Sequence, residues 1–188
     1  LTDLPICIDS SVIEALDAGL AVYEGKALVN SMTGEDERMD IILPLVKKYD
    51  AAILALPNDE IEIPMLAKDR MVIVEKIVRR VEKEGISLDN LLIDPLAMPV
   101  GADPENVKHT LETIYLIKEK YGLNMSIGAS NVSFGLPNRH ALNAAFMPMA
   151  MSMGLTPGGI CGDQDLVRKQ MSEYSIDSGI GGGLLEKF

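Results

Sequence analysis

Short runs of apolar and β-branched residues alternate with longer amphipathic segments along this chain. That alternation is typical of parallel β-strands joined by crossover helices. The apolar runs predict six strands, at residues 5–9, 27–30, 51–56, 91–94, 125–129 and 158–161. The amphipathic segments predict a helix after each strand, at residues 11–23, 35–48, 65–84, 104–121, 139–153 and 164–174. The pattern therefore indicates an α/β fold of six consecutive βα units.

Residues with strong positional preferences support several of these helix boundaries. Asp103 precedes Pro104, which places a capping carboxylate directly before a proline in the first helical turn. Gly85, Gly122 and Gly154 each follow a predicted helix, where glycine is favoured because it adopts a left-handed backbone without strain. The predicted helices thus have both start and stop signals.

Six βα units fit either an open doubly wound sheet or part of a (β/α)₈ TIM barrel. A nucleotide-binding doubly wound sheet would carry a glycine-rich turn after its first strand, whereas this chain has Asp9-Ser10-Ser11 there. We therefore favour the barrel. A complete barrel needs about 250 residues, and this chain has 188 and begins at Leu1 without methionine. We expect a single domain over residues 1–188 that supplies the C-terminal six βα units, with the two N-terminal units missing from this chain.

Composition narrows the possible functions. The net charge of -11 and the lack of a Lys/Arg cluster argue against nucleic-acid binding. No apolar run approaches the length of about 18 residues that a membrane span requires, and the first residues do not resemble a signal peptide. The two cysteines, Cys7 and Cys161, are too isolated to indicate a disulfide framework or a zinc site. We expect a cytoplasmic protein that binds neither membranes nor nucleic acids and holds no metal of its own.

Four predicted strands end in or just before polar side chains. These are Asp9, Asn30, Asp94 and the Ser130-Asn131 pair. Asp and Asn also favour turns and helix caps, but in a barrel the C-terminal strand ends gather around one mouth, where catalytic residues lie. Carboxylates and carboxamides together suit hydrogen bonding to a nitrogen-rich heterocycle. The sequence therefore predicts a binding site for such a compound at the mouth.

The segments around these residues resemble methyltetrahydrofolate:corrinoid methyltransferases, and the folate-binding domain of cobalamin-dependent methionine synthase is similar. The resemblance rests on CIDS at 7–10, LVNS at 28–31, IDPL at 93–96, SNVS at 130–133 and the following Asn138-Arg139. It implies a pterin-binding TIM barrel in which Asp9, Asn30 and Asp94 bind the amino and amide edge of the pterin. It also implies that Asn131 lies beside N5, the methyl-bearing nitrogen, as the catalytic residue.

The resemblance carries further expectations about the site and its partners. Ser130 and Arg139 match substrate-binding residues near the same mouth. The substrate is expected to be methyltetrahydrofolate, with tetrahydrofolate as product. The methyl group is expected to pass to or from the cobalt of a corrinoid (cobalamin) carried by a partner protein. A homodimer is implied as well.

Two other functions stay open at this point. Dihydropteroate synthase shares the barrel and the pterin cavity, but its equivalent of the Ser130-Asn131-Val132 turn is cationic, and this turn carries no charge. Displacement of pyrophosphate is hard to support without a nearby cation or metal. The second alternative is a pterin-binding or corrinoid-docking subunit that performs no chemistry.

Overall fold

The structure is a computed structural model that describes residues 5–156 and 160–161. Its strands are β1 (Cys7–Asp9), β2 (Leu28–Thr33), β3 (Ala52–Leu56), β4 (Leu91–Ile93), β5 (Asn124–Met125), β6 (Ile127–Gly128) and β7 (Ile160–Cys161). Its α-helices are α1 (Ile13–Val22), α2 (Asp36–Lys48), α3 (Ala67–Lys83), α4 (Glu105–Tyr121) and α5 (Arg139–Ser152). Two short 3₁₀ helices, η1 (Leu88–Asn90) and η2 (Ala129–Ser133), precede β4 and follow β6.

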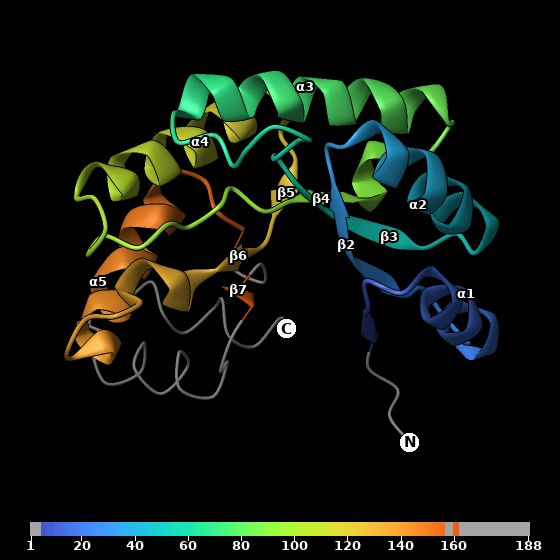
Figure 1. Cartoon of the computed structure of the whole chain (residues 1–188), viewed down its shortest axis with the longest axis horizontal. Coiled ribbons are helices and arrows are strands. Elements are labelled where there is room, and N and C mark those ends of the chain that lie inside the picture. The colour runs from blue at the N-terminus through green and yellow to red at the C-terminus, as the bar shows by residue number, and fades with distance from the viewer. Residues whose placement is uncertain (1–4, 157–159, 162–188) are drawn as a thin grey trace, which may run out of the picture.

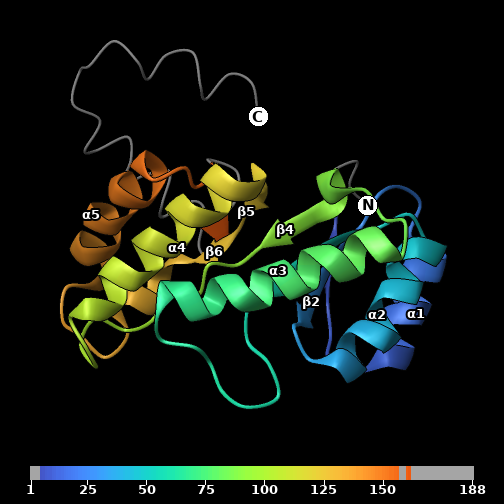
Figure 2. The ribbon, with the colours of Figure 1, turned by 90° about the horizontal axis from the view of Figure 1, so that it is seen from above.

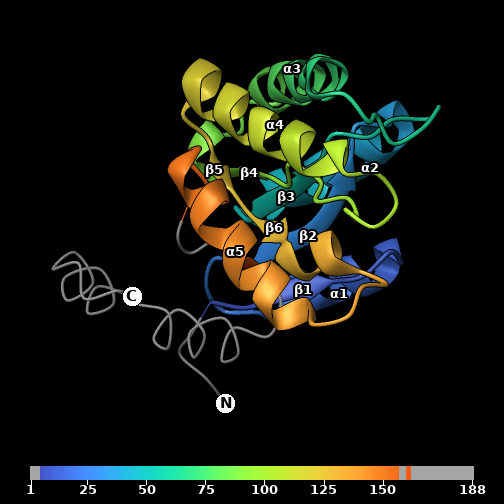
Figure 3. The same ribbon diagram turned by 90° about the vertical axis from the view of Figure 1, so that its left-hand side faces the viewer.

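The strands pair in the order in which they occur along the chain. One sheet runs β1-β2-β3-β4-β5, a second pairs β6 with β7, and every pairing is parallel. The helices lie along the outer side of the curved strands, as the ribbons show from two directions (Figure 1, Figure 3). A doubly wound sheet would reverse its strand order and carry helices on both faces. The α/β barrel arrangement predicted from the sequence is therefore confirmed.

The elements agree with the sequence pattern except at a few boundaries. The strand predicted over 125–129 is divided at Ser126 into β5 and β6, and the strand predicted over 27–30 continues to Thr33. The predicted stop at Gly122 is confirmed, because this residue ends α4 with φ of 65°. Asp103 accepts a hydrogen bond of 2.9 Å from the Glu105 backbone N–H at the start of α4. The helix predicted over 164–174 lies outside the described residues.

The core lies between the strands and the inner faces of the helices. Along α3, Ile73, Ile77 and Val81 recur every four residues and Val74 precedes Ile77 by three. All four are buried, as in an amphipathic helix packed on a sheet. Arg70 continues the same stripe and is fully buried as well. Figure 2 shows α3 between α2 and α4 on the outer side of the strands. No helix among the described residues has the length and apolar character needed to cross a membrane.

Candidate functional site

Asp9 and Asn30 meet at the C-terminal edge of the first two strands. They are register partners in the parallel pairing of β1 with β2, and Asn30 Nδ2 donates to Asp9 Oδ2 over 3.3 Å. Asp9 ends β1, as predicted. The prediction that Asn30 ends its strand is wrong, because after a register shift between Asn30 and Met32 β2 continues alongside β3 through Thr33. The two side chains nevertheless lie together.

The strand predicted over 91–94 ends one residue earlier, at Ile93, so that Asp94 directly follows β4. Burial raises the pKa of the Asp94 carboxyl from 3.8 to about 6. Hydrogen bonds from the backbone N–H groups of Leu96 and Gly128, and the positive charge of Arg70, act in the opposite direction. The Leu96 N–H donates to Asp94 Oδ1 over 2.8 Å. Asp94 is therefore an ionised hydrogen-bond acceptor at neutral pH, in a partly desolvated position.

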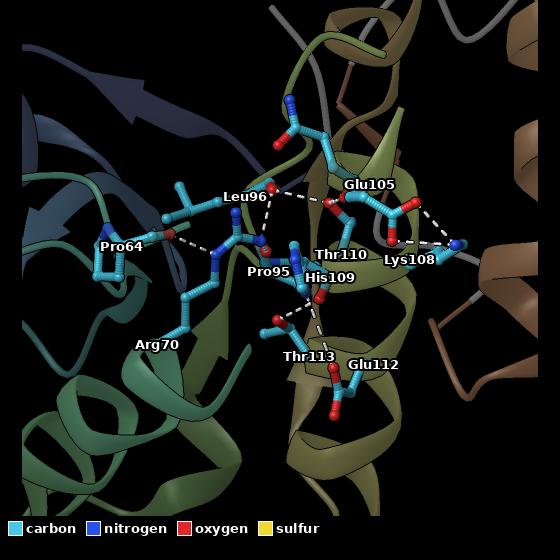
Figure 4. Close-up of polar contacts among 11 residues, drawn as sticks. Pro64, Arg70, Pro95, Leu96, Glu105, Lys108, His109, Thr110, Glu112 and Thr113 are labelled. Atoms are coloured by element: carbon cyan, nitrogen blue, oxygen red, sulfur yellow. Dashed lines mark hydrogen bonds and ion pairs between the residues drawn. The ribbon is translucent and has the colours of Figure 1, made fainter. Parts of the chain in front are cut away.

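Arg70, on α3, donates hydrogen bonds to the loop after Asp94 (Figure 4). Sequence reasoning missed this residue. Arg70 Nε donates to the Pro64 carbonyl over 2.8 Å, and Nη1 donates to the carbonyls of Pro95 and Leu96, each over 2.9 Å. Thr110 Oγ1 also donates to the Leu96 carbonyl over 3.1 Å. The available signal was an arginine placed within the apolar stripe of α3. That placement predicts a buried cation, although it does not identify the groups that it binds.

Asn131 lies in η2, three residues beyond the end of β6, and so does not end a strand directly. Its carboxamide lies over Gly128, because a Cβ at that glycine would be 3.0 Å from Asn131 Nδ2. The backbone N–H of the same glycine acts on the Asp94 carboxyl and lowers its pKa. Gly128 therefore brings Asp94 and Asn131 into one arrangement, although the two residues lie in separate segments of the sequence.

Ser130 and Arg139 contact each other at the same edge. Arg139 Nη2 donates to the Ser130 carbonyl and to Ser130 Oγ, each over 2.7 Å, and its Nε donates to Ser133 Oγ over 3.1 Å. The guanidinium carbon also lies 6.0 Å from the centre of the Phe134 ring. These contacts fasten the start of α5 to η2. Arg139 is thus placed to hold the turn that carries Asn131.

Asp9, Asn30 and Asp94 lie toward the C-terminal ends of β1, β2 and β4 in one parallel sheet, with β3 between β2 and β4, and Asn131 lies in η2 beside Gly128. Together they offer carboxylate acceptors and carboxamides that both donate and accept. A shallow cavity of about 510 Å³ between α3 and α4 contains none of these residues. The described residues include no group of three or more His, Cys, Asp or Glu side chains arranged to hold a metal. The arrangement suits recognition of a polar heterocycle through hydrogen bonds.

Comparison with known proteins gives a family and several relatives. A family model described as "Pterin binding enzyme" matches residues 1–158. The methylcorrinoid:tetrahydrofolate methyltransferase of Eubacterium limosum is 31% identical over 156 residues, which cover 81% of this chain and 58% of that protein. The methionine synthase of Mycobacterium tuberculosis is 30% identical over 165 residues, which cover 81% of this chain and 14% of that protein.

Among solved structures, a dihydropteroate synthase of Coxiella burnetii in complex with pteroic acid matches with a TM-score of 0.63. The match covers 92% of this chain and 66% of that one, at 20% sequence identity, so it supports the fold alone. The chain spans less than two thirds of the length of each of these three proteins.

Proposed function

Because the chain belongs to the pterin binding enzyme family, we propose that its polar strand ends bind the pterin of methyltetrahydrofolate. The native protein then transfers the N5-methyl group to, or from, the cobalt of a corrinoid carried by a partner protein. The observation that carries this proposal is that Asp94 and Asn131 both lie beside Gly128. It combines an ionised acceptor with a carboxamide at one edge of the sheet.

The acceptors suit the hydrogen-bonding edge of a pterin. A pterin presents an amino group and a ring N–H as neighbouring donors, and carboxylates accept from both. Asp94 is ionised above pH of about 6 and accepts a hydrogen bond from the Leu96 N–H, so it is oriented before a ligand arrives. Asp9, oriented by Asn30, supplies a second acceptor at the same edge. Preorganised acceptors of this kind lower the entropic cost of binding.

The proposed chemistry is a displacement at the methyl carbon. The bond from N5 to the methyl carbon breaks, the carbon bonds to cobalt(I), and the electron pair of the broken bond stays on N5. An amide-like anion is a poor leaving group, so N5 must gain proton character by the transition state. The Asn131 carboxamide can donate or relay a hydrogen bond to N5, where charge develops, and such differential stabilisation accelerates the reaction.

The dihydropteroate synthase-like alternative is less well supported by the side chains at η2. That reaction expels pyrophosphate and requires cations that are free to bind it. Arg139 is the cation that contacts η2, and its Nη2 and Nε are already bonded to Ser130 and Ser133. These contacts favour a positioning role for Arg139 over a role in binding phosphate. A turnover of pterin pyrophosphate by the native protein would reverse this preference.

The proposal is tested by rapid mixing of the native protein with methyltetrahydrofolate and a reduced corrinoid protein. The absorption spectrum of cobalt should report methyl transfer. Asn131→Ala should slow the transfer about a hundredfold, with a much smaller loss in folate affinity. The matched control is Asn124→Ala. Asn124 begins β5 and precedes β6, whereas the candidate site lies at the C-terminal ends of the strands, so this variant should not affect methyl transfer. Folate binding without transfer by the wild-type protein would instead support the non-catalytic subunit.

A further inference from the structure

Arg70 is a buried cation whose guanidinium has no carboxylate within ion-pair distance in the described part of the chain. The residue is 0% exposed, and burial lowers its pKa to about 10, while the charge of Asp94 acts to raise it. Burying a charge without an ion-pair partner costs several kcal/mol in general. A methionine or leucine would fill this position in the apolar stripe of α3 at far lower cost. The position therefore points to a role for the charge and its donors.

The donors of Arg70 join two loops at the mouth of the barrel. One donor binds Pro64, in the loop between β3 and α3, and the other binds Pro95 and Leu96 after β4 (Figure 4). The Pro95 carbonyl and the Leu96 N–H belong to one peptide group. Its oxygen accepts from Arg70, and its N–H donates to Asp94 Oδ1.

We propose that Arg70 is a positioning residue for the pterin-binding carboxylate of Asp94 and that it acts through the Pro95-Leu96 peptide group. A cation bound to the carbonyl oxygen polarises the peptide and strengthens its N–H as a donor, because hydrogen bonds in a chain reinforce one another. The stronger donor favours the ionised carboxylate and fixes its direction. The ligand assigned to Asp94 rests on the proposed function, whereas the coupling of Arg70 to Asp94 stands on the contacts alone.

The groups that face Asp94 make the expected effect specific. Arg70, from α3, is the charged group that acts on the carboxyl, β6 contributes the Gly128 N–H, and the loop contributes the Leu96 N–H. Arg70→Met removes the cation and its three hydrogen bonds, whereas Arg70→Lys retains the cation and cannot bridge all three carbonyls. The two variants therefore separate the effect of charge from the effect of geometry.

The first measurement is the titration of Asp94 followed by NMR of carboxyl carbons in ¹³C-aspartate-labelled native protein. Asp94 in Arg70→Met should titrate about one pH unit higher than in the wild type, since a nearby positive charge has been removed. In Arg70→Lys it should titrate close to the wild-type value. Arg79→Met is the matched control, because Arg79 lies on the same helix with an exposed side chain. An Asp94 titration that is the same in wild type and Arg70→Met would overturn the proposal.

The second measurement is folate affinity as a function of pH. Wild-type affinity should fall as the pH is lowered through the Asp94 titration, and the midpoint in Arg70→Met should move upward with it. Arg70→Lys should bind about tenfold more weakly at pH 8, because the two loops are no longer bridged, with its midpoint unchanged. If Arg70→Met does not fold, Arg70→Lys alone tests the proposal. A folate affinity of Arg70→Lys equal to that of the wild type at pH 8 then overturns it. If the wild type binds no folate, the proposed function fails, and the NMR titration still decides the role of Arg70.

Discussion

Asp94→Asn should make the unliganded protein more stable while weakening its binding of folate. The raised pKa of Asp94 means that the folded protein disfavours the ionised form. This penalty is absent below the unfolded-state value of 3.8, grows as the pH rises, and is complete above the folded-state value of about 6. A neutral asparagine avoids the penalty at every pH.

The magnitude follows from the size of the shift. A change from 3.8 to about 6 corresponds to about 3 kcal/mol. The carboxamide can still accept from the Leu96 N–H, but its NH₂ group cannot accept from a second backbone donor, and a lost bond of this kind costs about 1–2 kcal/mol. We therefore expect a net gain of about 1–2 kcal/mol in the free energy of unfolding at pH 8. The gain should vanish or reverse near pH 4.

The same substitution should weaken binding. The pterin donors would face a carboxamide with one acceptor oxygen and no charge, at a cost of about 1.5–3 kcal/mol, or roughly tenfold to a hundredfold in affinity. Wild-type affinity should fall as the pH drops below about 6. The affinity of the variant should be nearly independent of pH over the same interval. Stability and ligand binding would then change in opposite directions at one side chain.

Urea unfolding at pH 4, 6 and 8 measures the stability, and calorimetry with folate measures the affinity. Asp89→Asn is the matched control, because Asp89 is an exposed aspartate in η1, just before the same strand. That variant should change neither quantity by more than about 0.5 kcal/mol. An Asp94→Asn protein that is less stable than the wild type at pH 8, or equally stabilised at pH 4 and pH 8, would refute the reasoning.

Three further substitutions test the packing around the site. Gly128→Ala places a methyl group only 3.0 Å from Asn131 Nδ2 and should displace the carboxamide, so rapid mixing should show methyl transfer slowed about tenfold or more. An unchanged rate would separate Asn131 from the chemistry. Arg139→Met removes three hydrogen bonds to η2 and should lower the free energy of unfolding, measured by urea denaturation, by about 1 kcal/mol. An unchanged free energy of unfolding would show that these hydrogen bonds do not stabilise the fold. Gly34→Ala would drive a Cβ into Ile73 Cγ2 and should cost about 1–3 kcal/mol. In an Ile73→Ala background, which lacks Cγ2, the same substitution should cost much less in thermal unfolding, and an equal cost in both backgrounds would contradict this reasoning.

The sequence by itself determined the order and type of the elements. Strand and helix periodicities are local properties, so the apolar runs and the amphipathic stripes located β1 to β4 and α1 to α5 within a few residues. Asp9 and Asp94 could be placed at strand ends for the same reason. The motifs around Asn30 and Asn131 also carried the resemblance to the family that the comparisons confirm.

Only the tertiary structure decided which of these residues contact one another. The pairing of β1 with β2 brings Asn30 to Asp9, and the pairing with β3 extends β2 beyond Asn30. No local pattern links Asp94 to Gly128 or to Arg70, because those contacts join segments that approach only when the sheet curves and α3 packs on it. Arg70 lies in the apolar stripe of α3 and was missed by sequence reasoning, and the folded chain alone shows that it binds the peptide group that donates to Asp94.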